Sequence, residues 1–124
     1  MTENEISAEI LDAAIAAHNS IGGPGVLESY YEAALACELE LRGLKVASQV
    51  NIPILYKGAP VGDVVRLDLL VEDELIVELK SVEEIKDVHY KQLRTYLRLL
   101  GKDEGLLVNF GEYDFKKGLR RVTI

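Results

Sequence analysis

The chain has 124 residues, 48% of them hydrophobic and 28% charged, which is typical of one compact domain that folds without a disulfide or structural metal. Its formal net charge of −7 argues against a simple electrostatic coat protein for nucleic acid. The single cysteine, Cys37, excludes an internal disulfide and a multi-cysteine metal site. No apolar run is long enough for a membrane span, and the first residues show no basic leader. We therefore expect a single cytoplasmic domain over residues 1–124 with no membrane association.

Two helices are predicted at the start of the chain. Apolar residues recur at helical spacing over residues 5–19, with acidic residues early, and again over residues 27–42, where Gly43 ends the pattern. The segment Gly22-Gly23-Pro24-Gly25 between them cannot continue a helix, because proline restricts the residue before it and glycine favours turns. An N-terminal pair of helices follows from this pattern.

Strands dominate the rest of the chain and enclose a third helix. Gly101 ends that helix, which the apolar spacing places over residues 87–100. When a helix of this kind connects two strands of the same sheet, the strand after it is expected to lie parallel to the strand before it. The order of elements predicts an α/β fold with a mixed sheet. The expected strands cover residues 45–56 (interrupted at Pro53), 64–71, 75–82, 106–110 and 118–124, with a turn at 57–62.

Charged residues inside two neighbouring apolar strands are the informative anomaly. If residues 72–74 form a three-residue loop, Asp68 lies directly opposite Glu78, and both carboxylates point the same way. Opposed Cβ atoms are about 4.5–5.5 Å apart, so the pair can share a divalent cation. A two-residue loop would send the two side chains to opposite faces. Lys80 shares the face of Glu78, where it either polarises a water or a phosphate oxygen, or forms a salt bridge in a purely structural ion cluster.

Other polar residues of the helices have both ordinary and functional interpretations. Glu28 opens the second helix, where a carboxylate is favoured by the helix dipole. Two stripes run along the third helix. The first can orient a ligand or pack at a boundary, and the second can track phosphates or be solvated. The stripes consist of His89, Gln92 and Tyr96, and of Lys91, Arg94 and Arg98.

The charge is unevenly distributed along the chain. Residues 1–85 carry 16 acidic and 5 basic residues, whereas residues 86–124 carry 5 acidic and 9 basic residues. Such a block is either a solvated face or a phosphate-binding surface. Its basic residues beyond the third helix include Lys116, Lys117, Arg120 and Arg121.

Four motifs in order resemble those of a known family. They are the G-x-x-E-x-x-Y segment Gly25 to Tyr31, the segment Arg66-Leu67-Asp68, the E-x-K segment Glu78-Leu79-Lys80, and the Q-x-x-x-Y segment Gln92 to Tyr96. From about residue 21 to residue 124 the chain is similar to the GxxExxY protein family, a branch of the PD-(D/E)XK nuclease superfamily with the RecB-type Q-x-x-x-Y motif. The resemblance implies a restriction-endonuclease-like core of α-β-β-β-α-β, with an extra N-terminal helix and a short C-terminal strand. A departure is Leu67, which stands where the superfamily often has proline.

The resemblance also implies roles for individual residues. Asp68, Glu78 and the backbone carbonyl of Leu79 would bind Mg²⁺ or Mn²⁺, with Glu28 as an outer ligand or a water-orienting base. Lys80 would position or activate the attacking water. From the third helix, Gln92 and Tyr96 would hold the phosphate or the metal shell.

We therefore expect a divalent-metal-dependent nuclease that acts on nucleic acid, DNA in preference to RNA. The basic residues of the last third of the chain would face its phosphates. Two alternatives remain: a catalytically inactive module that binds nucleic acid or a protein partner, and a polar cluster that serves structure alone. Because little of a 124-residue chain lies outside the core, a homodimer or a protein partner would help to grip a duplex.

Overall fold

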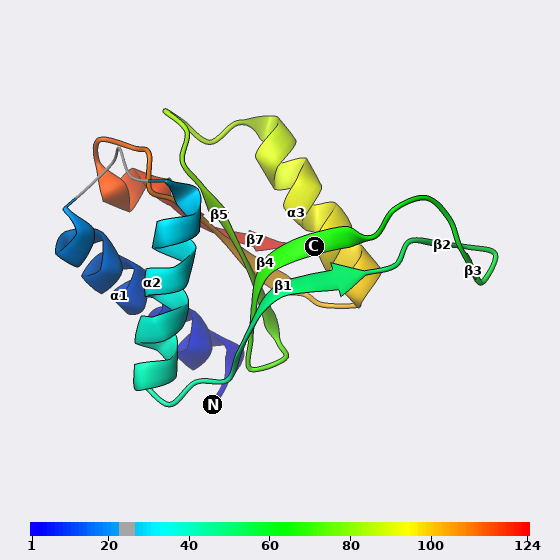
Figure 1. Cartoon of the computed structure of the whole chain (residues 1–124), viewed down its shortest axis with the longest axis horizontal. Helices are drawn as coiled ribbons and strands as arrows, with labels where there is room; N and C mark the ends of the chain where they lie inside the picture. The colour runs from blue at the N-terminus through cyan, green and yellow to red at the C-terminus, as the bar shows by residue number, and fades with distance from the viewer. Residues whose placement is uncertain (23–26) are drawn as a thin grey trace.

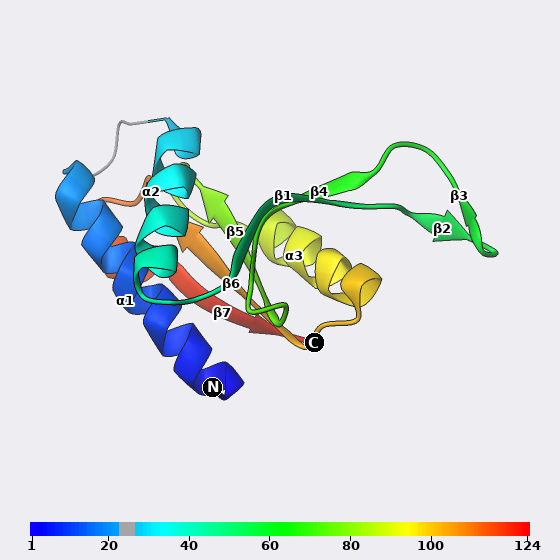
Figure 2. The same cartoon turned by 60° about the horizontal axis from the view of Figure 1, so that its bottom comes forward.

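The computed structural model describes residues 1–22 and 27–124, so most of the predicted glycine turn lies outside the described residues. It contains a five-stranded sheet in the order β1-β4-β5-β6-β7, with α1 and α2 on one face and α3 on the other (Figures 1 and 2). This is the predicted mixed α/β architecture. The helices are α1 (Glu3–Ile21), α2 (Glu28–Leu41), α3 (Asp87–Leu100) and the 3₁₀ turn η1 (Phe115–Gly118). The strands are β1 (Val46–Ile52), β2 (Leu55–Tyr56), β3 (Ala59–Pro60), β4 (Val65–Val71), β5 (Leu75–Lys80), β6 (Glu104–Asn109) and β7 (Leu119–Thr123).

Local sequence explains the bounds of the first helix. The Thr2 side chain accepts from the backbone N–H of Glu5, whose carboxylate accepts from the Thr2 backbone, and these two bonds form a capping box. At the other end Gly22 adopts φ +94°, a left-handed conformation that ends a helix. Helix α1 therefore extends two residues beyond each end of the predicted range.

The register of the central strands agrees with the prediction. Val71 pairs with Leu75 across the three-residue loop 72–74, which places β4 antiparallel to β5. Strand β6 pairs with β5 in parallel across the α3 crossover, as expected. Strand β1 lies antiparallel to β4 at one edge, and β7 lies antiparallel to β6 at the other.

The strand predicted over residues 45–56 is interrupted at Pro53 as expected, but its second part does not continue in the main sheet. Strand β1 ends at Ile52, immediately before Pro53, which cannot donate to a ladder. Beyond it, β2 and β3 form a separate two-stranded ribbon, so part of the predicted turn at 57–62 is strand. Lys57 and Gly58 both have positive φ, at 51° and 81°, as the tight turn between two such strands requires. This ribbon projects from the body of the protein (Figure 1).

Other boundaries differ by a few residues. Strand β5 ends at Lys80 rather than at residue 82, and β6 covers Glu104–Asn109 rather than residues 106–110. Turn η1 is absent from the sequence-based prediction, because four residues are too few to show a helical period. Its start is fixed by the Asp114 carboxylate, which accepts from the Lys116 backbone N–H at 3.2 Å.

The sheet separates two apolar cores. The larger one packs α1 and α2 against one face, with Ile10, Tyr31 and Leu35 fully buried. The smaller one packs α3 on the opposite face through Leu93 and Leu97. Among residues 1–22 and 27–124, no helix has the length and apolar character needed to cross a membrane.

Candidate active site

Strands β4 and β5 part at Asp68 and Glu78, and we call this point the fork. Ladder pairing between the strands is present from Val71–Leu75 to Leu69–Val77. At the fork, carboxylate oxygens replace backbone carbonyls as the hydrogen-bond acceptors. The Asp68 backbone N–H donates to Glu78 Oε1 at 3.0 Å, and the Leu79 backbone N–H donates to Asp68 Oδ2 at 2.8 Å. The two carboxylates therefore face each other across the strands, as the three-residue loop predicts.

Glu78 is the most deeply buried carboxylate at the fork. Only 4% of the residue is exposed. Burial raises the pKa of Glu78 to about 8, and the neighbouring charge of Asp68 acts in the same direction. Two facing carboxylates in a partly dry setting thus favour either a proton or a cation between them.

The neighbouring strand β1 is distorted at the same level. Gln49 has φ +53°, which is uncommon for a residue other than glycine within a strand. The β1–β4 pairing passes from Ser48–Leu69 to Val50–Leu67 without a pair at Gln49 and Asp68. Because the left-handed residue reverses the alternation, Ala47 and Val50 both pack on the α3 side. Asp68, opposite this distortion, lines a cleft together with Glu28 of α2.

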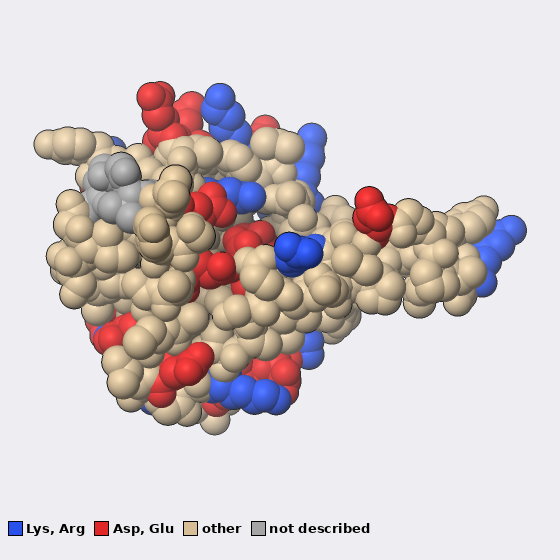
Figure 3. Space-filling model, in the orientation of Figure 1, with Lys and Arg blue, Asp and Glu red and all other residues tan. Residues whose placement is uncertain are grey.

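A cleft of about 140 Å³ lies between this distortion and α2. Its lining includes Asp68 and two carboxylates one helical turn apart, Glu28 and Glu32. Burial raises the pKa of Glu28 and, after it, the charge of Asp68 does so too. Burial also raises the pKa of Glu32, whose Oε1 accepts from Gln49 Nε2 at 2.5 Å. Figure 3 shows acidic side chains gathered in this hollow beside a basic one.

Helix α3 supplies the opposite side of the fork. Lys80 Nζ donates to Gln92 Oε1 at 3.0 Å, which fixes the lysine at the end of β5. Burial, and next the charge of Glu78, raise the pKa of Tyr96, and a hydrogen bond with Gln92 opposes them. His89, from the same predicted stripe, instead caps its helix: its Nδ1 accepts from the Lys86 backbone N–H at 2.9 Å. Gln92 and Tyr96 thus lie near Lys80 and Glu78, whereas Nδ1 of His89 is engaged at the start of its own helix.

The family assignment rests on nearly the whole chain. A model of the PD-(D/E)XK nuclease superfamily matches residues 4–122. The chain belongs to the PD-(D/E)XK nuclease superfamily. No curated protein and no solved structure matches it significantly. Membership supports the nuclease-like fold and suggests nuclease activity in general.

Nucleases of this superfamily generally use divalent metals, and the donor chemistry at the fork fits such an ion. Within the described residues, no three His, Cys, Asp or Glu side chains are already grouped around a common point as a metal site. Asp68 and Glu78 nevertheless face each other, each with one oxygen engaged by a backbone N–H, and the Leu79 carbonyl lies on the adjoining backbone. Oxygen donors of this kind suit Mg²⁺ or Mn²⁺.

Sequence analysis missed the residue that fixes the chain after β5 of this PD-(D/E)XK domain. Asn109 is fully buried; its Oδ1 accepts from the backbone N–H groups of Val82 and Gly111, and its Nδ2 donates to the Val82 carbonyl at 2.8 Å. A side chain at Gly111 would place Cβ 2.4 Å from the Val82 oxygen. Asn109 therefore holds the segment that follows Lys80. The only signal in the sequence was one amide within an apolar run.

Gln49 and Glu32 were also missed. Glutamine in a strand and glutamate on a helix carry no motif, and the positive φ at Gln49 cannot be recognised from residue type. A weak signal for Glu32 was its position one turn after Glu28 on the same helix. Both residues line the cleft that also contains Glu28 and Asp68.

The seven basic residues predicted to contact phosphate do not form one patch. Lys91, Arg94 and Arg98 lie on α3, whereas Lys116 and Lys117 lie in η1, which packs on the other face of the sheet through Phe115. On β7, Arg120 Nη1 donates to the Leu119 carbonyl, and Arg121 bonds with Glu104 and Asn4. Their phosphate-binding role stays a prediction, with the α3 residues nearest to the elements of the fork.

Proposed function

We propose that this domain hydrolyses phosphodiester bonds of nucleic acid with Mg²⁺ or Mn²⁺, and that DNA is preferred to RNA. The reciprocal pairing of Asp68 and Glu78 carries the proposal, because it sets two carboxylates side by side at the open end of the sheet. We also assign the chain to the GxxExxY branch. In that motif Glu28 lines the cleft and Tyr31 stacks on Phe110 in the core at 4.2 Å, while Gly25 lies outside the described residues.

The proposed ligands are the Asp68 and Glu78 carboxylates and the Leu79 carbonyl, with Glu28 outside them. Held by these residues, a divalent ion would supply Lewis acidity, which lowers the pKa of water and offsets negative charge on the phosphate. Glu28, whose pKa is raised by burial and by Asp68, is suited to accept the proton of the attacking water.

Lys80 is the cation of the site. Gln92 holds its Nζ at 3.0 Å, and this position favours the negative charge that develops on the phosphate oxygens. The water oxygen attacks phosphorus in line as the bond to the leaving oxygen breaks. Tyr96, through Gln92, keeps the lysine in place.

A calorimetric Mn²⁺ titration tests the proposal without a choice of substrate. We expect saturable binding by the wild-type protein, loss of binding in Asp68→Asn, and retention in Asp73→Asn. The last is a matched control, because Asp73 lies in the loop at the far end of the same hairpin and is 64% exposed. Absence of binding in the folded wild type, both alone and with inorganic phosphate to complete a metal shell, would overturn the metal site.

The inactive-module alternative has one observation in its favour: no metal site is preformed in the described residues. Such a module binds nucleic acid equally well in EDTA and tolerates Lys80→Ala. The metal-dependent nuclease instead loses hydrolysis in EDTA and in that variant. Hydrolysis of plasmid DNA and of a folded RNA, followed on gels with and without Mn²⁺, separates the two functions and tests the preference for DNA.

A further inference from the structure

Strands β1 and β4 continue past the fork into the two-stranded ribbon β2–β3. We call residues 53–64 the arm; it extends away from the body in both views (Figures 1 and 2). Four apolar side chains of the arm are 44–64% exposed, an unusual density for so short a segment. Grouped exposure of this kind marks an interaction surface. The four are Leu55, Tyr56, Val61 and Val64.

The arm has its own turn and hydrogen bond, and its base is buried in the core of the protein. Its tip is the tight turn at Lys57 and Gly58, and the Val61 backbone N–H donates to the Ile54 carbonyl at 2.9 Å. At its base, Ile52 and Leu67 are buried in the core beneath α3. A two-stranded ribbon has little stability alone. Contacts with a bound partner would therefore stabilise the arm.

Basic side chains lie at both ends of the arm. Arg66 is exposed at its base and is held by Asn51, whose Oδ1 accepts from Arg66 Nε at 3.3 Å. Arg66 lies two residues from Asp68, a separation of about 7 Å along β4. It is on the side of the strand opposite buried Leu67. At the tip, Lys57 Nζ lies 5.5 Å from the centre of the Tyr56 ring.

We propose that the arm binds double-stranded DNA by entering its major groove, while Arg66 contacts a phosphate next to the one at the fork. This proposal rests on the proposed nuclease function and specifies its substrate as a duplex. A B-form major groove is about 12 Å wide and admits a two-stranded ribbon. Strand length from Arg66 to Gly58 gives a reach of about 26 Å, which spans several base pairs.

The same geometry disfavours other nucleic acids. The major groove of an A-form RNA duplex is too deep and narrow for side chains to read, and a single strand has no groove. Exposed aliphatic side chains on the arm suit contact with thymine methyl groups. Basic residues at both ends suit the phosphates on either side of the groove.

Charge-matched variants test the arm. In an Asp68→Asn background that prevents hydrolysis, Lys57→Gln/Arg66→Gln is compared with Lys45→Gln/Lys102→Gln, which removes two positive charges beside Asp73 at the other end of the sheet. Fluorescence anisotropy of a labelled DNA duplex of about two helical turns is measured over a range of salt. We expect the arm variant to bind at least tenfold more weakly, with a salt slope shallower by about 2, and the control to keep the slope.

A second variant removes apolar contacts without removing charge. Leu55→Ser/Tyr56→Ser changes only exposed side chains, so folding is retained. We expect it to lose most of the preference for a DNA duplex over an RNA duplex of the same sequence. Equal affinities of arm and control variants for DNA would overturn the proposal. So would a shift from dimer to monomer on sedimentation of the arm variants, because the arm would then bind a second copy of the chain.

The failure of the arm and the failure of the nuclease are distinguishable. The arm variants, made with Asp68 intact, are expected to bind Mn²⁺ like the wild type, because neither Lys57 nor Arg66 belongs to the proposed metal ligands. Loss of Mn²⁺ binding in the wild type would count against the proposed function. Normal Mn²⁺ binding with unaltered duplex affinity in the arm variants would count against the arm alone.

Discussion

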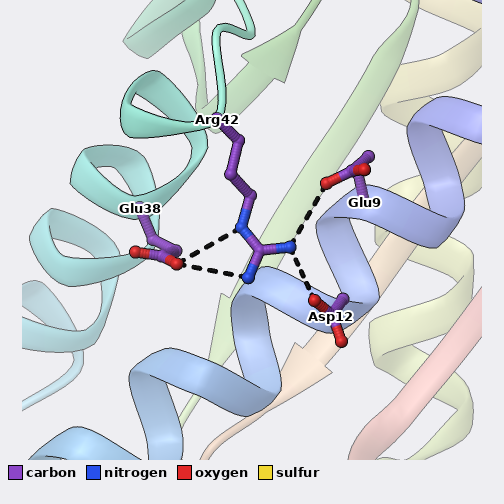
Figure 4. Close-up of polar contacts among 4 residues, drawn as sticks. All are labelled: Glu9, Asp12, Glu38 and Arg42. Carbon is purple, nitrogen blue, oxygen red and sulfur yellow. Dashed lines mark hydrogen bonds and ion pairs between the residues drawn. The ribbon is translucent and has the colours of Figure 1, made fainter.

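Two clusters of carboxylates in this protein differ in how their negative charge is balanced. In the first, which we call the latch, Arg42 at the end of α2 bonds with Glu9 and Asp12 of α1 and with Glu38 of its own helix (Figure 4). The nitrogen–oxygen distances are 3.2, 2.6 and 3.2 Å. Bonding with Asp12, in particular, raises the pKa of Arg42, so the cation stays charged. The latch joins two helices with the protein's own positive charge.

The fork has carboxylates without such a cation. Within residues 1–22 and 27–124, no ion pair within 4.0 Å joins its carboxylates to a lysine or arginine, and Lys80 donates to an amide instead. Burial raises the pKa values of Glu28, Glu32 and Glu78. The two clusters therefore differ in how their charge is balanced: the latch is neutralised by Arg42, whereas the proposed metal site at the fork would be neutralised by an external cation.

The largest expected effect is on hydrolysis when Lys80 is changed. Lys80→Ala removes the cation that Gln92 holds at the end of β5, so we expect hydrolysis to fall by about 10³-fold, as for loss of an oriented charge-stabilising donor. The melting temperature should change little, because the side chain is partly exposed and, among the described residues, its one hydrogen bond is to Gln92. Initial rates in Mn²⁺ measure the effect, and Lys45→Ala is the matched control. A Lys80→Ala enzyme with wild-type rates would contradict the assignment.

Next in size is the effect of pH on stability through Glu78. In the unfolded chain this carboxyl titrates near the ordinary glutamate pKa of 4.5, and in the folded protein its pKa is about 8, so between these values the folded state binds more protons. The free energy of unfolding therefore falls as pH rises from about 4.5 through 8. Glu78→Gln removes this dependence and should be more stable than wild type by roughly 2–4 kcal/mol at alkaline pH, and similar in acid.

Urea denaturation in EDTA, in acid and at alkaline pH, measures this difference. Gln keeps the oxygen that accepts from the Asp68 backbone N–H, so the fold at the fork is preserved. If the free energy of unfolding depends on pH in the same way for wild type and Glu78→Gln, the pKa of Glu78 is not raised in the metal-free protein. Adding Mn²⁺ should then raise the melting temperature of the wild type but not of Glu78→Gln.

A smaller stability effect is expected at the latch. Arg42→Met keeps much of the side-chain volume but leaves three carboxylates without a cation, which should cost about 1–2 kcal/mol at neutral pH. Mn²⁺ binding and hydrolysis should be unchanged, because the latch lies at the other end of α2 from Glu28. Thermal unfolding and a Mn²⁺ titration check both statements. Loss of Mn²⁺ affinity in Arg42→Met would show that the two clusters are coupled.

Sequence patterns predict most of the fold and the carboxylate pair of the fork, but not the latch. Helix α3 has the predicted bounds, and the loop length places Asp68 opposite Glu78, because these features follow from local periodicity and turn length. The latch cannot be predicted in this way, since its residues are ordinary surface charges 30 or more positions apart for two of the three pairs. Part of the arm is predicted as a turn because β2 and β3 have only two residues each.

Gln49 marks the limit of such prediction, because its importance lies in a backbone angle. With φ +53° it interrupts β1 opposite Asp68 and donates to Glu32. Gln49→Gly accepts this angle but loses the hydrogen bond, so we expect near-neutral stability and a moderate loss of activity. Gln49→Val resists the angle and should be less stable than Gln49→Gly by about 1 kcal/mol.

The valine variant also tests how the fork is made. If the left-handed residue turns Asp68 toward α2, a valine that restores regular pairing at Gln49 turns the carboxylate away, and hydrolysis falls further than in Gln49→Gly. Urea denaturation and initial rates, measured on both variants, check the two effects together. Equal rates and equal stabilities would show that the position of Asp68 depends on β5 alone, through the bond from the Leu79 backbone N–H.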